Sequence, residues 1–352
     1  MSMRGRRLLP NGDLDHVLDH TRDLWDELRG QRVFITGGTG FFGRWLLETL
    51  FWANDRLCLD LSALVLSRSP EAFRKAAPHL AGHRAIGFHT GDVRAFEFPA
   101  GKFSHIIHAA TESSAKLNAE EPLIMFDTIV DGTRRTLEFA RHCGVRKFLL
   151  TSSGAIYGKQ PPEVTHIPED HLGAPDPIDP RSAYGEGKRA AETLCTLFSK
   201  QYGIDTRIAR CFAFVGPYLP LDVHFAIGNF IRDGLKGGPI VVEGDGTPQR
   251  SYLYAADLAI WLWTILFRGQ NNRIYNVGSE EGVSISELAH MVAASFSPEV
   301  GVIVRGKPDL RKAPERYVPS TARANRELGL APWISLSAAI ARTIAFHRDP
   351  VA

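Results

Sequence analysis

The chain has 352 residues, 44% of them hydrophobic, and is therefore long enough to bury a large core in one or two domains. Its 41 lysine and arginine residues nearly balance 39 acidic residues, and the net charge of +2 excludes a field strong enough to favour nucleic acid or an anionic membrane. The four cysteines are scattered and form no C-x-x-C pair, so we expect neither a disulfide framework nor a metal site, and a reducing, cytoplasmic location.

The N-terminal thirty residues predict a packed helix rather than a targeting segment. They are basic at the start but lack the apolar run of a signal peptide. Residues 12–29 place Leu14, Val17 and Leu18 at helical spacing, and Gly30 follows as a stop signal, which predicts an amphipathic helix on the main body. The longest apolar stretch, residues 258–267, is too short to cross a bilayer, so we expect no membrane segment.

From Arg32 onward, short β-rich runs alternate with longer helical stretches, a pattern typical of βαβ units and a parallel sheet. The expected strands are residues 32–36, 63–67, 85–89, 105–110, 147–153 and 206–212. The expected helices between them are near 42–54, 120–142 and 184–202, and later ones are near 224–236, 256–267, 284–296 and 335–347. Six strands with crossovers predict an α/β fold with a Rossmann-type, doubly wound parallel sheet.

The rhythm of the elements divides the chain into three expected regions. Residues 1–30 form an N-terminal helical extension, and residues 31–215 form the Rossmann-type domain. After residue 215 the pattern becomes irregular, so residues 216–352 predict a smaller C-terminal α/β lobe. No long linker separates the last two regions, and we expect their boundary to be interleaved.

A glycine-rich loop joins the first expected strand to the first crossover helix. In "VFITGGTGFFGRWLLETL", the glycines permit a tight turn and let the backbone approach a pyrophosphate, whose charge then lies at the helix N-terminus. The strand before and the helix after meet the context that a dinucleotide site requires. The residues assigned to this cofactor loop are Gly37, Gly38, Gly40, Phe41, Phe42 and Gly43.

The ends of the second and third strands bear on the choice of cofactor. Ser67 and Arg68 stand where an NAD-binding fold often carries an acid for the ribose 2′-hydroxyl. Arg68 could pair with the 2′-phosphate of NADP or be an ordinary solvated arginine, and both readings stay open. Asp92, followed by Val93, could accept a hydrogen bond from the adenine amino group, or it could cap its own loop.

Tyr184 and Lys188, in "SAYGEGKRAAE", are four residues apart and therefore project from one face of the same helix. A free tyrosine has a pKa of about 10, and a neighbouring ammonium stabilises its phenolate. Bringing that pKa near neutrality needs roughly 4 kcal/mol from Lys188 and a cationic nicotinamide together. The pair is therefore a candidate base, although a single Tyr-x-x-x-Lys pair can also be a surface feature.

Six segments of the chain, in this order, identify a family that the chain resembles: TGGTGFFG, HAATES, TSSGAIYG, YGEGK, RCFAFVGP and GDGTPQRSYLYAADLA. From about residue 31 to the end, the chain resembles the extended short-chain dehydrogenase/reductase family, in its nucleotide-sugar epimerase and dehydratase branch. The resemblance implies an NAD-dependent enzyme whose substrate is a nucleotide-diphosphate sugar. It also implies that Ser153 hydrogen-bonds the reacting sugar oxygen, Tyr184 removes its proton, and Lys188 holds the nicotinamide ribose and lowers the tyrosine pKa.

Further site residues follow from the same resemblance. The HAATES segment assigns Ala109, Ala110 and Thr111 to the cofactor site and Glu112 and Ser113 to the substrate site. The substrate contacts expected elsewhere are Ser153, Gly154, Asn229, Arg250 and Arg316. Arginine suits a diphosphate because its guanidinium group binds phosphate through two hydrogen bonds. A surface ion pair remains the alternative for either arginine, as a helix-surface role does for Asn229.

The two residues after Ser153 restrict the reaction. Dehydrating relatives typically carry an acid/base pair there, and decarboxylating relatives usually keep a glutamate, but Gly154 and Ala155 have no side chain that transfers a proton. The first hypothesis is therefore an epimerase acting at sugar C4 through a transient ketone. An NADP-dependent ketosugar reductase is second, favoured by Ser67 and Arg68.

A dehydratase with a relocated acid such as Glu112 is third, and a non-catalytic cofactor-binding scaffold is the alternative of another class. The expected cofactor is NAD, with NADP as the alternative. Two departures from the family pattern, Ala213 and Ser251, leave the nucleotide and the sugar open.

The two long helices of the first domain predict an assembly. In this family such helices commonly pair across a two-fold axis, so we expect a homodimer. The apolar residues on which this rests are Leu123, Ile124, Phe126, Ile129, Val130, Leu194, Leu197 and Phe198.

Overall fold

A seven-stranded parallel sheet organises the part of the chain that is described in the computed structural model, residues 8–111, 115–223, 225–309 and 311–348. The strand order is β11-β6-β5-β4-β1-β2-β3, and every neighbouring pair is parallel. The strands are β1 (Arg32–Thr36), β2 (Ser62–Ser67), β3 (Ile86–Thr90), β4 (His105–His108), β5 (Lys147–Ser153), β6 (Asp205–Cys211) and β11 (Arg273–Val277). This is the predicted doubly wound α/β sheet with one strand more.

The extra strand, β11, corrects the prediction of six strands. Its sequence, RIYNV, pairs with β6 from Arg273 opposite Arg207 to Val277 opposite Cys211. It follows helix α9 (Ala255–Arg268) in the region where the alternation of elements is irregular. Residues after 216 therefore return to the main sheet, and the two large regions of the chain are interleaved.

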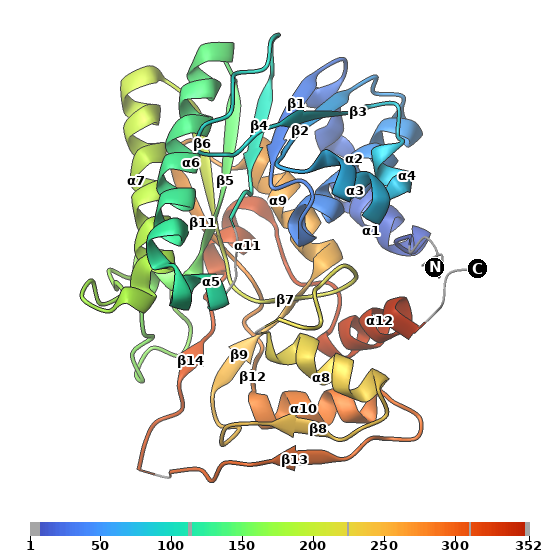
Figure 1. The fold of residues 1–352 in the computed structure, drawn as a ribbon, viewed down its shortest axis with the longest axis vertical. Coiled ribbons are helices and arrows are strands. Elements are labelled where there is room, and N and C mark those ends of the chain that lie inside the picture. Colours follow the sequence, from blue (N-terminus) through green and yellow to red (C-terminus); the bar gives the residue numbers. More distant parts are fainter. Residues whose placement is uncertain (1–7, 112–114, 224, 310, 349–352) are drawn as a thin grey trace.

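Alternating residues of the sheet supply two separate cores. Because side chains of a strand alternate between faces, Phe34 packs with the helices on one side while Val33 and Ile35 pack on the other. Helices α6 (Pro122–Cys143) and α7 (Ala183–Tyr202) belong to the core of Phe34 and stand side by side at the left of Figure 1. Helices α2 (Phe41–Leu57) and α9 belong to the other core.

The predicted N-terminal helix is divided in the structure. It is an α-helix only over α1 (Asn11–Thr21) and continues as the 3-10 segment η1 (Arg22–Leu28). Thr21 marks the change, because its φ of −127° and ψ of 5° are not helical. Its Oγ1 donates to the carbonyl of Val17 (2.6 Å) and accepts from Nε1 of Trp25 (3.0 Å). The prediction of one continuous helix over residues 12–29 was therefore wrong in its second half.

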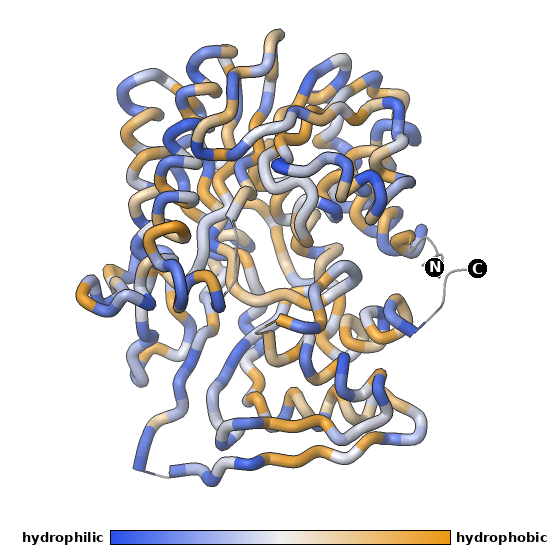
Figure 2. The backbone as a smooth tube through the Cα atoms, in the orientation of Figure 1, coloured by the Kyte–Doolittle hydropathy of each residue, from blue (hydrophilic) through white to orange (hydrophobic). Residues whose placement is uncertain are grey.

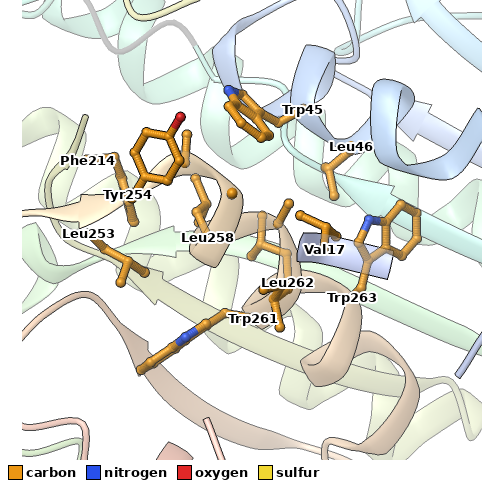
Figure 3. Packing of buried hydrophobic residues seen from close by; sticks show 14 of the residues in the cluster. Val17, Trp45, Leu46, Phe214, Leu253, Tyr254, Leu258, Trp261, Leu262 and Trp263 are labelled. Atoms are coloured by element: carbon orange, nitrogen blue, oxygen red, sulfur yellow. The ribbon is translucent and has the colours of Figure 1, made fainter. Parts of the chain in front are cut away.

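The N-terminal extension packs on α9, which is apolar around its whole circumference. Figure 3 shows Val17 of α1, Trp45 of α2 and Trp263 of α9 in one buried cluster. The rings of Trp25 and Trp263 are 4.9 Å apart between centroids. A helix that is hydrophobic on every side is a core helix when other helices surround it, which accounts for the apolar run at 258–267. Among the described helices, none combines the length and apolarity that crossing a membrane requires.

The remaining elements lie below the main sheet in the view of Figure 1 or connect its strands. The helices are α3 (Pro70–Ala76), α4 (Pro78–Ala81), α5 (Ala115–Glu120), η2 (Gly154–Tyr157), η3 (Pro180–Ser182), α8 (Ala226–Leu235), α10 (Ile285–Ala294), α11 (Ala322–Leu328) and α12 (Leu336–Arg348). The strands are β7 (Phe214–Val215), β8 (Ile240–Val242), β9 (Gln249–Ser251), β10 (Leu253–Tyr254), β12 (Gly282–Ser284), β13 (Val302–Val304) and β14 (Arg316–Tyr317). They form the small sheets β10-β7, β12-β9-β14 and β13-β8. Figure 2 shows hydrophobic stretches along β8 and β13 at the lower edge.

The apolar residues from which the homodimer was predicted fall into two groups. Leu123, Ile124 and Leu197 are exposed on α6 and α7. Ile129, Leu194 and Phe198 are buried within the chain itself, and Phe126 and Val130 are half-buried. The prediction of a homodimer therefore depends on the exposed group.

Candidate active site

The glycine loop between β1 and α2 is packed so tightly that side chains are excluded from it. A Cβ on Gly43 would lie 2.3 Å from Cα of Gly38, and one on Gly37 would lie 2.4 Å from the carbonyl oxygen of Ala109. Gly37 also has a φ of +72°, which side-chain-bearing residues rarely adopt. Gly40 is the N-cap of α2 and has no side-chain cap, so no side chain of the N-cap satisfies the first N–H groups of the helix, the arrangement that anion-binding helix ends use.

The residues at the ends of β2 and β3 are held by local hydrogen bonds. Ser67 Oγ accepts from the backbone N–H of Ser69 (3.2 Å), and Arg68 is exposed. Asp92 accepts from Nε (2.9 Å) and Nη2 (3.0 Å) of Arg94 and from its backbone N–H (2.9 Å). The hydrogen bonds from Arg94, with a smaller contribution from the charge of Arg68, lower the pKa of Asp92. The carboxylate of Asp92 is therefore engaged by its own loop.

The loop after β4 is fixed by a buried histidine that the sequence reading did not single out. Thr36 Oγ1 accepts from the N–H of Ala110 (3.2 Å) and lies 2.8 Å from Nδ1 of His108. Nε2 of His108 lies 3.0 Å from Oγ1 of Thr133. Burial, and then the charge of Lys188, lower the pKa of His108 to about 3, so the ring is neutral at pH 7. Neutral His108 can therefore join these two threonines without adding charge beside the cofactor loop.

Other residues predicted beside the cofactor are placed as follows. Val93 packs on α6, where a Cβ added to Gly132 would lie 2.9 Å from its Cγ1. Thr111 Oγ1 donates to the carbonyl of Ala110 (2.8 Å). Glu112 and Ser113 lie outside the described residues.

The three predicted catalytic residues come together at the end of β5. Ser153 is the last residue of the strand and Tyr184 and Lys188 are in the first turns of α7. Tyr184 is hydrogen-bonded to Ser153, whose Oγ also accepts from the N–H of Ala155 (3.1 Å). Nζ of Lys188 lies 5.9 Å from the centroid of the Tyr184 ring. The sequence order and the i, i+4 spacing therefore produce the expected cluster.

The surroundings lower the pKa of Lys188 and raise the pKa of Tyr184. Lys188 is 3% exposed and donates to Oγ1 of Thr111 (2.7 Å) and to the carbonyl oxygen of Thr151 (2.8 Å). Burial lowers the pKa of Lys188 to about 8. Burial raises the pKa of Tyr184, and the hydrogen bond to Ser153 opposes that rise. The protein alone therefore keeps the phenol neutral, and an added cation is needed to make it a base near pH 7.

A second tyrosine, Tyr317 of β14, also bonds Ser153 and was missed in the sequence. A Cβ on Gly154 would lie 2.7 Å from the hydroxyl of Tyr317 and 2.7 Å from the ring of Phe212. A side chain at position 154 would therefore meet these two aromatic residues. Tyr317 directly follows Arg316 in the chain. Because side chains alternate between the faces of a strand, the prediction made for Arg316 could have drawn attention to Tyr317 on the opposite face.

The two arginines predicted for the diphosphate lie on opposite faces of one small sheet. β9 and β14 are parallel, with Arg250 opposite Tyr317 and Gln249 opposite Arg316. Arg250 shares the face of Tyr317, 5.9 Å from its ring centroid. Arg316 instead donates through Nε to Gln249 Oε1 (3.0 Å) and through Nη1 to the carbonyl of Pro162 (2.8 Å). The structure therefore brings Arg250 toward the Ser153 cluster and does not bring Arg316 with it.

Asn229 is half-buried on α8 and is engaged with its own helix. Its Oδ1 accepts from Nη1 of Arg232 (2.9 Å), which also pairs with Asp233. This contact agrees with the alternative prediction for Asn229, a role on the surface of its helix rather than at the diphosphate.

Comparisons with known proteins agree with this architecture. Residues 33–278 match the model of the NAD dependent epimerase/dehydratase family. UDP-glucuronic acid decarboxylase 6 of Arabidopsis thaliana is 32% identical over 306 residues, which cover 87% of this chain and 85% of that protein. UDP-glucuronic acid decarboxylase 1 of Danio rerio is 29% identical over 317 residues, 90% of this chain and 72% of that protein.

Two solved structures share the fold closely. UDP-glucose 4-epimerase of Thermotoga maritima, solved with UDP-glucose, gives a TM-score of 0.74 at 21% identity, covering 90% of this chain and 98% of that one. The dTDP-glucose 4,6-dehydratase of Streptomyces venezuelae, solved with NAD and TYD bound, gives a TM-score of 0.74 at 25% identity, covering 90% and 97%. With the matched family model, the glycine loop and the Ser153, Tyr184 and Lys188 cluster on a Rossmann-type sheet, the chain belongs to the NAD-dependent epimerase/dehydratase family of enzymes.

Proposed function

We propose that the enzyme is an NAD-dependent nucleotide-sugar epimerase that oxidises and reduces the sugar transiently at C4. The observation that carries the proposal is the pairing of a complete Ser153, Tyr184 and Lys188 cluster with a filled space at Gly154. Such a site has the groups needed to move a proton from a carbinol oxygen. Among the residues that the structure describes, positions 154 and 155 beside them supply no carboxylate of the kind that water loss uses.

The residues present fit NAD. The uncapped N-terminus of α2 and the crowded glycines Gly37 and Gly43 form a cradle for a pyrophosphate. Lys188 is placed to hold the nicotinamide ribose, and Thr111 and Thr151 orient its ammonium. NAD, when bound, supplies the hydride acceptor and donor, and its positive nicotinamide ring adds to the charge that favours the phenolate.

The side chains of the chain itself handle the proton. Ser153 Oγ holds the sugar C4 hydroxyl next to the phenol of Tyr184, which takes the proton from that oxygen and later returns it. Lys188, a cation on the same face of α7, stabilises the phenolate form. Tyr317, bonded to the same serine, limits how Ser153 can turn. The ketone formed at C4 must rotate before reduction for epimerisation to result.

Water loss is disfavoured by the surroundings of Gly154. An acidic side chain there would overlap the ring of Phe212 and the hydroxyl of Tyr317. Ala155 offers a methyl group and donates its backbone N–H to Ser153. A 4,6-dehydratase would therefore require a relocated acid, for which Glu112 remains the sequence candidate.

Decarboxylation is the second candidate, because the curated relatives that cover 87–90% of the chain are UDP-glucuronic acid decarboxylases. Oxidation at C4 of a sugar with a C6 carboxylate gives a β-keto acid. Its C5–C6 bond breaks with release of carbon dioxide, and the electron pair passes to the C4 carbonyl; C5 then takes a proton and the hydride returns to C4. This route needs the same carbinol oxidation, but Gly154 and Ala155 stand where decarboxylating relatives usually keep a glutamate.

The test is product analysis with UDP-, dTDP-, CDP- and GDP-hexoses and with UDP-glucuronate, each with NAD and with NADP. An epimerase gives a product of unchanged mass with an inverted C4 proton by NMR. Loss of carbon dioxide from UDP-glucuronate alone would replace the epimerase with the decarboxylase. A 4-keto-6-deoxy product, with loss of water and solvent deuterium at C5, would contradict both.

The choice between NAD and NADP is tested in the same native preparation. Mass spectrometry of the purified protein under non-denaturing conditions identifies a retained cofactor directly. Retained NAD is expected for a reaction that returns its hydride in every turnover. Retained NADP would support the ketosugar reductase and would assign Arg68 to the 2′-phosphate.

A further inference from the structure

A buried carboxylate lies on the same helix face as the catalytic residues of α7. Tyr184, Lys188 and Glu192 follow one another at intervals of four residues, so their side chains share one face. Glu192 is only 7% exposed. A charge so deeply buried requires partners that replace its water, and the partners of Glu192 come from two strands of the main sheet.

Glu192 joins α7 to the ends of β5 and β6. Its Oε1 accepts from Ser152 Oγ (2.5 Å). Arg210 donates through Nε to Oε1 (3.0 Å) and Oε2 (3.2 Å) and through Nη2 to Oε2 (2.7 Å). Ser152 and Arg210 are register partners across the two strands. One carboxylate therefore fixes the helix and both strand ends by hydrogen bonds to charged or buried groups, the strongest kind available.

The hydrogen bonds of Arg210 extend this network to further residues. Nη1 of Arg210 donates to the hydroxyl of Tyr157 (2.7 Å) and to the carbonyl of Glu169 (3.0 Å). Tyr157 donates to Oδ1 of Asn276 in β11 (2.8 Å). Because its members satisfy one another in buried surroundings, the network resists displacement of any single member.

Successive residues of β5 thus have different partners on α7. Ser152 bonds Glu192, and Ser153 bonds Tyr184. The distance between the reactive serine and the phenol is therefore set partly by a contact one residue earlier in the strand. A displacement of about 1 Å at such a contact costs on the order of 100-fold in rate in typical enzymes.

We propose that Glu192 is a positioning residue for the redox step: through Ser152 and Arg210 it holds the end of β5 against α7, and it places a carboxylate one helical turn from Lys188. The inference rests on the proposed function, because it takes the cluster of Ser153, Tyr184 and Lys188 as the reaction centre.

The charge effect follows from the groups that face Lys188. On α7 these are Tyr184, Glu192 and Cys195, on β6 Cys211 and on β4 His108. Burial raises the pKa of Cys211 to about 12 and raises that of Cys195, so neither thiol is charged at neutral pH. His108 is neutral, and the hydrogen-bond acceptors of the ammonium are a threonine hydroxyl and a carbonyl. Among these groups, all of them within the described residues, Glu192 is the anion. Its negative charge opposes the loss of the proton from Lys188.

The geometric half of the proposal is tested with Ser152→Ala in the NAD complex. The variant should fold, bind NAD within about twofold of wild type, and lose about 10- to 100-fold in kcat with little change in KM. Ser199→Ala is the matched control, because Ser199 is a buried serine of α7 that donates to Asn271 (3.1 Å), away from β5. Equal losses in the two variants would overturn the positioning role of Ser152.

The charge half is tested with Glu192→Gln and Glu192→Asp. Removing the carboxylate should let Lys188 lose its proton at lower pH, which moves the alkaline limb of the kcat profile down. The phenolate of Tyr184 then loses the stabilising charge of Lys188. The acid limb of the kcat profile therefore moves to higher pH, and the active pH range narrows from both sides. Glu192→Asp keeps the charge but shortens the reach, so it should lower kcat while leaving both limbs in place. A merely structural role would lower the profile without narrowing it.

Failure of this inference is separable from failure of the proposed function. The phenolate of Tyr184 can be titrated without turnover, as the ultraviolet difference between each protein and its Tyr184→Phe version in the presence of NAD. Glu192→Gln should titrate at higher pH than wild type even if no sugar is converted. An unchanged titration together with wild-type kcat would overturn the inference, and if Glu192→Gln does not fold, Ser152→Ala and Glu192→Asp decide it.

Discussion

Two regions of the molecule differ in how their candidate site residues are fixed: the proposed catalytic half, which carries Ser153, Tyr184 and Lys188, and the lobe below the sheet. In the proposed catalytic half, these residues come from the end of a seven-residue strand, β5, and from a twenty-residue helix, α7. In the lobe, Arg250 and Arg316 come from strands of three and two residues. A short strand has no periodic pattern of its own, so its register with neighbours decides which face each residue takes.

This difference separates the diphosphate candidates. Register places Arg250 with Tyr317 and leaves Arg316 on the other face, bonded to Gln249 and Pro162. Two arginines that look equivalent in the sequence therefore have different surroundings. The comparison teaches that the sequence can predict which residues of a long element share a face, whereas the placement of residues on short strands needs a structure.

The largest expected effect is in the catalytic half, for Tyr184→Phe. The variant keeps the ring but removes the proposed base, so it should fold and bind NAD while losing about 100- to 10,000-fold in kcat. Steady-state kinetics and NAD titration measure the two properties. Tyr317→Phe is the matched variant, because it removes the other phenol bonded to Ser153 and should lose less. Near-wild-type turnover by Tyr184→Phe would remove this tyrosine from the mechanism.

A smaller effect is expected in the lobe, where Arg250→Ala and Arg316→Ala should differ. Loss of a charged hydrogen bond to phosphate costs about 1.5–3 kcal/mol, so Arg250→Ala should raise KM by roughly 10- to 150-fold. Arg316→Ala should change KM by less than about threefold, because this guanidinium lies on the face away from Tyr317, where Gln249 and Pro162 accept its hydrogen bonds. Substrate-dependence of the initial rate gives both values. Equal effects, or the reverse order, would show that the face assignment does not govern substrate binding.

The smallest effect on activity is expected at the outer surface of α6 and α7. Leu123 and Leu197 are 76% and 52% exposed, and we expect them to lie in a homodimer interface. Leu123→Asp with Leu197→Asp should give a monomer by light scattering at micromolar concentration, with activity within a few-fold. Leu172→Asp is the control, since this leucine is 97% exposed but lies outside both helices. A wild-type protein that is already monomeric would end the dimer prediction.

The sequence predicted those parts of the fold and site in which periodicity or local spacing carries the information. The alternation of strands and helices predicted the sheet, while β11 was missed because it follows a buried helix in an irregular region. The i, i+4 spacing predicted that Tyr184 and Lys188 share a face. Tyr317 and Glu192 escaped notice because their roles depend on contacts between elements, which no local pattern encodes. Thr21 shows the same limit on a smaller scale, since its non-helical backbone, with φ −127° and ψ 5°, interrupts the α-helix that the periodicity predicted to continue.

The attachment of the N-terminal helix has a consequence for synthesis of the chain. Asp13 accepts from the hydroxyl of Tyr254, and His16 pairs with Asp257, in both cases across 241 residues of sequence. A ribosome adds about 5–20 residues per second, so roughly 12–48 s pass before the partners of α1 exist. Throughout that interval Val17 and Trp25, buried in the finished protein, have no α9 to cover them. Helix α1 is thus made well before α9, which covers it, and the nascent chain exposes this apolar surface until α9 follows.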